Sequence, residues 1–168
     1  MLNSISFNPL KKASLLLILI VSVFTSCTKE SIEESVNLTT ASSHNLVAME
    51  QELLVLINDH RNSLGYTSLE FNEVAYKYAN IHNEYMIEKG ELSHDNYTAR
   101  ATKIANEVGA NHIGENVAKD YTSAAEALEK WLASSSHKKT IEGEFSFTGI
   151  SVKENANGNL YYTQIFYN

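Results

Sequence analysis

Apolar residues recur at three- and four-residue spacing in two long stretches of the chain, which predicts two amphipathic helices. The first helix is expected over residues 46–64, and Gly65 follows it as a helix-ending glycine. The second is expected to begin after Asn72, a residue type that caps helix N-termini, and to end at Gly90. Because each helix has one apolar face, both should pack against other parts of the protein.

Two further helices are predicted downstream. One is expected over residues 96–108 and is ended by a glycine. The other begins after Ser123, which forms a capping box with Glu126, and should end at the three serines of residues 134–136. His137 would then lie just beyond a helix C-terminus, where the negative end of the helix dipole favours a protonated imidazole.

The last part of the chain changes to the pattern of β-strands. Residues 145–152 and 160–167 are rich in aromatic and β-branched side chains, and Asn157-Gly158 between them is a strong hairpin signal. The second strand is apolar on both faces, which is typical of a central strand covered by helices on each side. Four helices and a small, mostly antiparallel sheet predict an α+β protein built as a three-layer α-β-α sandwich.

The N-terminus has the pattern of a secretory signal. Lys11 and Lys12 precede an apolar run over residues 15–21, which is too short for a comfortable membrane span. Cys27, the only cysteine, comes after Phe24-Thr25-Ser26 at the end of this run and resembles the processing site of bacterial lipoproteins. That resemblance implies cleavage before Cys27 and its lipidation; the alternative is a secreted protein with a free cysteine.

We therefore expect a signal peptide over residues 1–26, a polar tether over residues 27–42 and one domain over residues 43–168. Removal of the signal leaves 11 basic against 20 acidic residues, a net charge of −9. An acidic chain without a basic stripe argues against nucleic acid as a partner. The expected location is the cell envelope, with the lipid anchor attaching the protein to a membrane, or alternatively the secreted fraction.

Three short polar stretches stand beside segments that should be buried, and together they offer two imidazoles and one carboxylate. The candidate residues are His94, Glu115 and His137. Gly114 is expected to let the backbone turn sharply before the carboxylate. Two histidines and an acid can hold zinc or another divalent metal. The alternative is that both histidines are hydrogen-bonded boundary residues and Glu115 caps a turn.

Several motifs occur in a specific order along the chain. They are Leu92-Ser93-His94, Ile113-Gly114-Glu115-Asn116-Val117-Ala118, the Trp131 helix reaching Ser136-His137-Lys138, Phe147-Thr148-Gly149-Ile150-Ser151-Val152 and Tyr161-Tyr162-Thr163-Gln164-Ile165-Phe166. Over residues 47–167 this order resembles a bacterial member of the CAP superfamily, which is named for cysteine-rich secretory proteins, antigen 5 and pathogenesis-related proteins. The resemblance implies an α-β-α sandwich with a surface cleft lined by two histidines and acidic residues.

The resemblance also implies roles for individual residues. His94 and His137 match the two cleft histidines, and Glu115 matches the carboxylate of the Gly-Glu-Asn motif. A further glutamate of the eukaryotic members falls here on Ser134, so the fourth cleft group is missing or replaced. Asn116 and Gln164 are expected as further ligand-cleft residues.

Three functions remain open from the sequence. The first is a binding module that takes a divalent metal through His94, His137 and Glu115, or a lipid, glycan or peptide ligand. The second is a metal-dependent hydrolase acting on envelope or extracellular substrates, with Glu115 as the base. The third is a structural or interaction domain without chemistry, in which the histidines serve packing. His82 is expected to be a packed core or boundary histidine.

Overall fold

The computed structural model describes residues 44–168, so the expected signal, the tether and Cys27 lie outside the described residues. The helices are α1 (Val47–Ser63), α2 (Glu73–Lys89), α3 (Tyr97–Val108), α4 (Ala124–Ala133) and α5 (Ser135–Ile141). The strands are β1 (His44–Asn45), β2 (Glu70–Phe71), β3 (Ile113–Lys119), β4 (Phe147–Glu154) and β5 (Leu160–Tyr167). Within the described residues, no helix is long and apolar enough to cross a membrane.

The strands form one sheet in the order β1-β4-β5-β3. β4 and β5 make the predicted antiparallel hairpin, in which Phe147 lies opposite Tyr167. β3 pairs antiparallel with the other side of β5 and sets Asn116 opposite Gln164. β1 and β2 share the outer edge of β4, where β1 runs antiparallel and β2 parallel to it. β5 is therefore a central strand, as its two apolar faces predicted.

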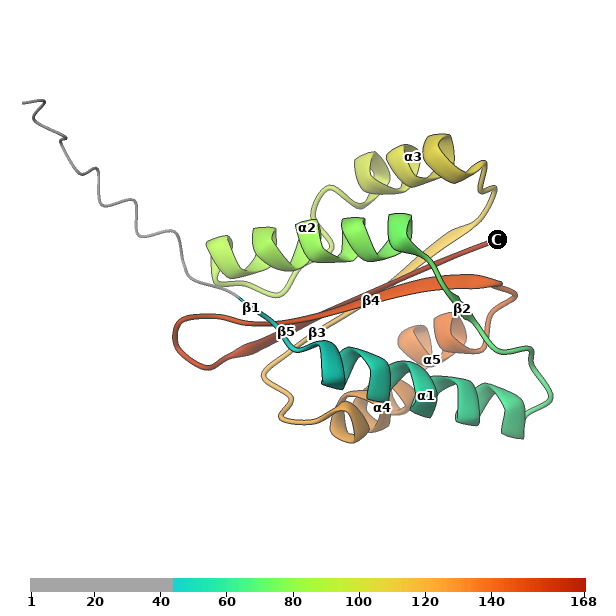
Figure 1. The fold of residues 1–168 in the computed structure, drawn as a ribbon, viewed down its shortest axis with the longest axis horizontal. Helices are drawn as coiled ribbons and strands as arrows, with labels where there is room; N and C mark the ends of the chain where they lie inside the picture. Colours follow the sequence, from blue (N-terminus) through green and yellow to red (C-terminus); the bar gives the residue numbers. More distant parts are fainter. Residues whose placement is uncertain (1–43) are drawn as a thin grey trace, which may run out of the picture. The chain divides into compact units, whose positions relative to one another are not determined.

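Helices cover both faces of this sheet. α2 and α3 lie on one face, and α1, α4 and α5 lie on the other (Figure 1). On the α4 side, Trp131 and Phe166 are buried in the larger core cluster, while Ile104 and Ile165 belong to the cluster under α2 and α3. Nε1 of Trp131 donates to the carbonyl of Val117 at 3.2 Å, which satisfies its polar atom inside the core. The three-layer α-β-α sandwich is thus confirmed.

The helix ends follow the predicted capping residues. The side chain of Asn72 accepts hydrogen bonds from the backbone N–H groups of Val74 and Ala75, at 2.9 and 3.2 Å. Gly90 and Gly109 end α2 and α3 with φ of 73° each, a left-handed conformation that a side chain would strain. Short-range signals were enough here because each cap involves residues only a few positions apart.

α2 packs directly onto β4, and two features allow it. A Cβ at Gly149 would lie 2.1 Å from the backbone nitrogen of Tyr76, so only glycine permits this approach. Nδ2 of the buried Asn83 donates to the carbonyls of Ser151 and Tyr161, at 2.8 and 3.0 Å. These bonds satisfy a polar group that would otherwise be costly to bury, and they fix α2 across both strands.

Two predictions about the polar stretches are wrong. Gly114 does not make a sharp turn; it lies within β3, where a Cβ would come 2.8 Å from the side chain of Thr140. His137 does not follow a helix C-terminus. Only Ser134 leaves the helical conformation, and because the N–H of Lys138 donates to its carbonyl at 2.8 Å, a new helix, α5, begins there. His137 lies in the first turn of α5, so the dipole there does not favour its protonated form.

Candidate functional site

The Gly-Glu-Asn stretch lies on β3, the edge strand that pairs only with β5 among the described strands. Side chains alternate along a strand, so Glu115 points to the opposite face from its two neighbours. Glu115 meets residues at the α3 side, whereas Nδ2 of Asn116 donates to the backbone carbonyl of His137 in α5 at 3.1 Å. One strand thus holds the carboxylate on one face and ties α5 to the other.

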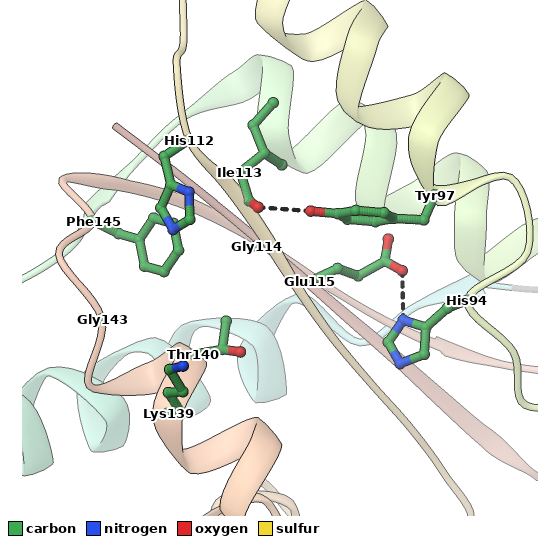
Figure 2. Close-up of a pocket in the computed structure, with 10 residues that line it drawn as sticks. All are labelled: His94, Tyr97, His112, Ile113, Gly114, Glu115, Lys139, Thr140, Gly143 and Phe145. Atoms are coloured by element: carbon green, nitrogen blue, oxygen red, sulfur yellow. Dashed lines mark hydrogen bonds and ion pairs between the residues drawn. The ribbon is translucent and has the colours of Figure 1, made fainter.

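The carboxylate of Glu115 is the centre of a polar cluster. Its Oε2 accepts from Nε of Arg100 at 2.7 Å, and Nη2 of Arg100 lies 2.6 Å away. Its Oε1 accepts from Nδ1 of His94 at 2.9 Å, a bond drawn in Figure 2. The side chain of Glu115 is 1% exposed and that of His94 is 52% exposed. The buried acid therefore reaches solvent only through the histidine.

Glu115 stays ionised in this environment. Burial alone would raise its pKa, but the hydrogen bond from His94 and the positive charge of Arg100 outweigh burial and hold the pKa below its usual value. A general base works best with a pKa near the operating pH. The cluster therefore makes Glu115 a fixed acceptor, and it does not favour the hydrolase alternative.

The bond to Glu115 also sets the state of His94. Since Nδ1 donates to the carboxylate, the neutral ring leaves Nε2 as an exposed acceptor. A carboxylate behind an imidazole in this way orients the ring, as it does at many metal and proton-transfer sites. His94 is thus held ready to contact a ligand through Nε2.

His82 lies behind this pair. It is 1% exposed, as expected for a core histidine, and its Nε2 donates to the carbonyl of Ser93 at 2.8 Å. Burial lowers its pKa, so the ring is neutral, and Nε2 lies 3.9 Å from Oε1 of Glu115. His82 therefore positions the loop that carries His94.

Two serines directly precede the histidines, Ser93 before His94 and Ser136 before His137, but neither is arranged as a nucleophile. The hydroxyl of Ser93 accepts from the N–H of Asp95 at 3.4 Å, and that of Ser136 lies 3.2 Å from the hydroxyl of Ser134. Among residues 44–168, neither hydroxyl is hydrogen-bonded to an imidazole. Serine chemistry therefore has no support in this geometry.

A cleft of about 460 Å³ opens beside the cluster (Figure 2). Its lining comes from the start of α3, from β3 and from the segment between α5 and β4. These residues are His94, Tyr97, His112, Ile113, Gly114, Glu115, Lys139, Thr140, Gly143 and Phe145. The sequence identified His94 and Glu115 of this set. It missed the others because they come from loops and from the ends of short elements, where periodicity does not show which side chains face a common cavity.

The remaining expected cleft residues lie elsewhere. Asn116 and Gln164 are fully buried within the sheet and do not line this cleft, nor does Ser134, at the junction of α4 and α5. His137 is outside the lining too, although the charge of His94 acts on it. Its pKa is lowered chiefly by burial and additionally by that charge. The two imidazoles therefore lie in one region of the protein, but only His94 lines the cleft.

The residues present fit a metal less well than the sequence suggested. Within residues 44–168, no three His, Cys, Asp or Glu side chains are arranged to hold a metal ion. Both oxygens of Glu115 already accept hydrogen bonds, one from Arg100 and one from His94. The carboxylate would therefore support the ligand His94 and would not itself bind the metal. A metal here would have two imidazoles at most from this set.

Arg100 is the functional residue that sequence reasoning missed. It lies on α3 one turn before Ile104, and both are buried. An arginine at four-residue spacing from a buried isoleucine is a signal that it faces inward. A buried arginine requires an acceptor, and that requirement could have pointed to Glu115.

Comparison with known proteins agrees with this arrangement. Residues 54–166 match the cysteine-rich secretory protein family, CAP. The chain is 27% identical over 134 residues to the uncharacterized protein YkwD of Bacillus subtilis, covering 78% of this chain and 52% of that protein. It is 31% identical over 121 residues to the uncharacterized membrane protein YlbC of the same organism, covering 70% of this chain and 34% of that protein. The chain thus spans only part of each relative.

Solved structures share the fold. An outer surface protein from Borrelia burgdorferi has a TM-score of 0.69 at 16% identity, covering 76% of this chain and 97% of that one. An extracellular protein containing an SCP domain from Bacillus anthracis has a TM-score of 0.64 at 26% identity, covering 72% of this chain and 40% of that one. With a family match across most of its length and the same α-β-α sandwich, the chain belongs to the cysteine-rich secretory protein (CAP) family.

Proposed function

We propose that this protein is a binding module of the cell envelope or extracellular space whose cleft takes a ligand with a carboxylate or phosphate on an apolar chain. The observation that carries this proposal is the charge balance of the cleft. Its one acid, Glu115, is neutralised by Arg100, and Lys139 has no ion pair among the described residues. His112 adds a ring that can donate a hydrogen bond.

The charge of the cleft is opposite in sign to the net charge of the whole chain. The sequence carries a net charge of −7, so an anion gains nothing from the molecule at large. An unpaired lysine attracts an anionic group locally, because charge-assisted hydrogen bonds are among the stronger ones. The anionic end of the ligand would therefore lie against Lys139.

The other end of the cleft suits an apolar chain. The rings of His112 and Phe145 stack at 4.8 Å, and Ile113 lies beside them in the lining. The hydroxyl of Tyr97 donates to the carbonyl of Ile113 at 2.6 Å, so its polar atom is already used. Apolar walls with a few placed polar groups are typical of small-molecule sites.

Paired ligands and paired lysines test the proposal. Octanoate and octanol have the same chain and differ in charge, so octanoate should bind more tightly to the full chain in calorimetric titration. Lys139→Gln should weaken octanoate about threefold to tenfold by removing its charged partner. Lys138→Gln is the matched control, since Lys138 is the neighbouring exposed lysine outside the cleft lining and lies 3.8 Å from Glu142.

Equal binding of octanoate and octanol would reject an anion-selective cleft. Equal losses in the two lysine variants would reject Lys139 as the contact and leave only a general charge effect. All titrations are made at the same ionic strength, so that salt screening is equal for both ligands and for all variants.

A divalent metal such as zinc is a second, separate proposal, in which His94 and His137 are the ligands and Glu115 orients His94. It is supported by the free Nε2 of His94 and by the lowered pKa of His137, which keeps that ring neutral and able to bind. Elemental analysis after dialysis checks it: wild type should retain metal that His137→Ala loses. The same metal content in both would remove His137 from any metal site.

A further inference from the structure

A second pocket, of about 310 Å³, lies at the opposite edge of the sheet from the cleft. It opens between the first turns of α1 and α2, beside the outer edge of β4. Its walls are largely apolar and include Val47, Leu54, Phe71 and Ile150, and both Val47 and Phe71 are 50% exposed. Exposed apolar side chains around a cavity indicate a binding surface.

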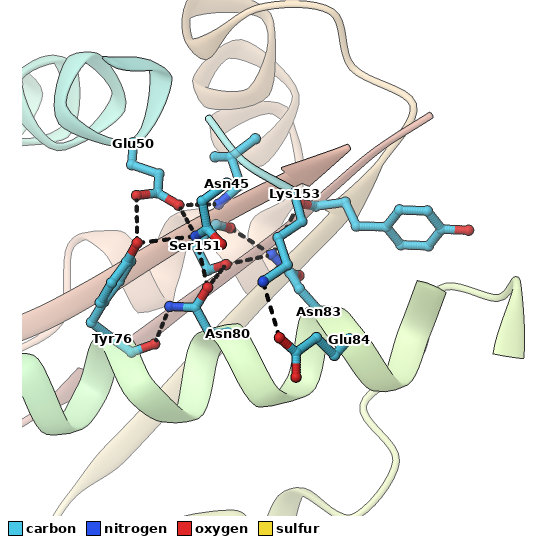
Figure 3. Close-up of polar contacts among 10 residues, drawn as sticks. Asn45, Glu50, Tyr76, Asn80, Asn83, Glu84, Ser151 and Lys153 are labelled. Carbon is cyan, nitrogen blue, oxygen red and sulfur yellow. Dashed lines mark hydrogen bonds and ion pairs between the residues drawn. The ribbon is translucent and has the colours of Figure 1, made fainter. Parts of the chain in front are cut away.

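The carboxylate of Glu50 lines this apolar pocket, although the residue is only 6% exposed. Figure 3 shows its side-chain partners Asn45 and Tyr76, and all of its partners are neutral donors. Oε1 accepts from Nδ2 of Asn45 at 2.7 Å and from the N–H of Val152 at 2.9 Å, and Oε2 accepts from the hydroxyl of Tyr76 at 3.0 Å. None of residues 44–168 gives it a cationic partner, whereas buried charges are usually paired.

The surrounding chain increases this negative charge. Residues 44–76, which form β1, α1, β2 and the start of α2, contain five acidic residues and a single Lys or Arg, namely Arg61. Arg61 is buried and donates to backbone carbonyls, including those of Thr67 and Gly143, so it neutralises no acid of the pocket. Lys153 of β4 lies opposite Asn45, but its ammonium group is paired with Glu84 at 3.0 Å. The field at this edge therefore favours a cation.

The aromatic side chains suit a cation as well. The rings of Phe71 and Tyr76 lie 5.6 Å apart and are tilted by 55°. An ammonium group placed over the outer face of either ring is attracted to the negative charge of that face, and aromatic rings are used in this way to recognise alkylated ammonium ligands.

A backbone acceptor completes the site. The N–H of Leu46 donates to the carbonyl of Val152, and that of Asn72 donates to the carbonyl of Thr148, where β1 and β2 meet β4. Backbone groups of alternate residues point to the same edge of a strand, so the carbonyl of Ile150 faces the gap between β1 and β2. It can accept a hydrogen bond from an ammonium N–H.

We propose that this pocket is a second binding site that takes an organic ammonium group carried on an apolar stem. The cation lies against Glu50 and the rings of Phe71 and Tyr76, and the stem lies against Val47 and Leu54. A primary ammonium could come from a lysine side chain or from a free alkylamine, and the experiment separates these two sources. The site is distinct from the cleft and selects the opposite charge.

Glu50 also has a structural part, because it links β1, α1, α2 and β4. A substitution must therefore remove its charge and keep its shape. Glu50→Gln does this, since the amide oxygen can still accept from Val152 and the amide nitrogen can donate to Tyr76.

In the test, the full chain is titrated with hexylamine and with hexanol, and binding is measured by calorimetry and by NMR chemical-shift changes. Hexylamine should bind more tightly than hexanol, and Glu50→Gln should abolish that preference. Phe71→Ala should weaken hexylamine about threefold to tenfold through loss of one ring face, and its side chain is exposed enough for the variant to fold. Val47→Ala should weaken both probes, whereas Val55→Ala, 58% exposed on the same helix outside the pocket, should weaken neither.

Nα-acetyl-lysine methylamide, added in a separate titration, distinguishes the sources: binding as tight as hexylamine identifies a lysine side chain, and binding only of hexylamine identifies a free alkylamine. The proposal is overturned if hexanol binds as tightly as hexylamine, or if Glu50→Gln keeps the preference. Octanoate, the probe of the cleft, is titrated into Phe71→Ala as well. Unchanged octanoate binding there, together with weaker hexylamine binding, shows that the substitution acts on the second pocket and not on the folding of the domain.

Discussion

At the scale of single residues, the site rests on the contrast between the two partners of Glu115. Arg100 is a buried guanidinium bound to one carboxylate oxygen, whereas His94 is a half-exposed imidazole bound to the other. The arginine therefore fixes the carboxylate, and the histidine connects that carboxylate to solvent. The two partners can be separated by substitution.

Arg100→Leu should destabilise the domain strongly, because it leaves a buried carboxylate without its cation. Breaking one side of a buried pair costs about 3–5 kcal/mol. Urea unfolding of the two proteins measures the change. Lys77→Ala is the control: its pair with Glu107 is 2.8 Å long but exposed to solvent, so its loss should change the stability little. Similar losses in both variants would show that Glu115 does not depend on Arg100.

Acid should weaken the fold in two separate pH ranges. The pKa values of His82 and His137 are lowered by burial. Below about pH 6.5 the unfolded chain therefore binds protons that these rings do not bind in the folded protein, and the free energy of unfolding decreases as the pH is lowered. Glu115 has a lowered pKa as well, but as an acid it stabilises the fold above its unfolded value of 4.5, and this contribution is lost at lower pH.

His82→Gln isolates the upper of these ranges. The amide can still donate to Ser93, but it does not titrate, so the loss of stability between pH 7 and 5 should become shallower. Each unit by which the pKa is lowered corresponds to about 1.4 kcal/mol. Unfolding curves across this range measure the slope, and His44→Gln, with a side chain 64% exposed, serves as the control. An unchanged slope in His82→Gln would assign the acid sensitivity to other groups.

At the scale of elements, the contact of α2 with β4 depends on one missing side chain. Gly149→Ala places a Cβ against the backbone of Ala75 and Tyr76, which cannot move without the helix, and should cost about 3 kcal/mol or more. Gly114→Ala meets only side-chain atoms of Thr140 and Phe145 and should cost about 1–2 kcal/mol. Denaturant unfolding ranks the two. The reverse order would mean that α2 can shift on the sheet.

The elements also separate what the sequence could predict from what it could not. α2 and α3 were predicted almost to the residue, because Asn72, Gly90 and Gly109 act on neighbouring residues and follow local rules. β1 and β2 have two residues each, which is too short for any alternation to appear, and they exist only because β4 offers an edge. Their absence from the sequence-based prediction has this physical cause.

The helix break at Ser134 follows the same logic. Three serines predicted the end of a helix, and one residue does leave the helical conformation. Whether the chain then continues as a loop or begins α5 depends on the contact between Asn116 and the carbonyl of His137, which joins residues 21 apart. The partnership of Glu115 with Arg100 likewise requires the position of α3 against β3. Local sequence rules identify the residues of such a site and do not identify their partners.

At the scale of the whole molecule, the domain carries two candidate sites at opposite edges of one sheet. The cleft lies beside β3 and the second pocket beside β4, with β5 between those two strands. The two sites differ in the sign of their charge. A domain of this kind would bind two chemically different groups independently, so ligands of one site should not compete with those of the other.

Attachment to the envelope is predicted from the N-terminal sequence, which lies outside residues 44–168. Our prediction is that Cys27 is lipidated, so Cys27→Ala should move the protein from the membrane fraction to the soluble fraction. A single acyl chain gives only marginal binding, with each buried methylene contributing about 0.8 kcal/mol, and the several chains of a lipoprotein are needed for stable attachment. Fractionation followed by immunoblotting measures the distribution, and Thr28→Ala, one residue further on, should leave it unchanged. Continued pelleting of Cys27→Ala with membranes would show that the apolar run at residues 15–21, or a protein partner, retains it instead.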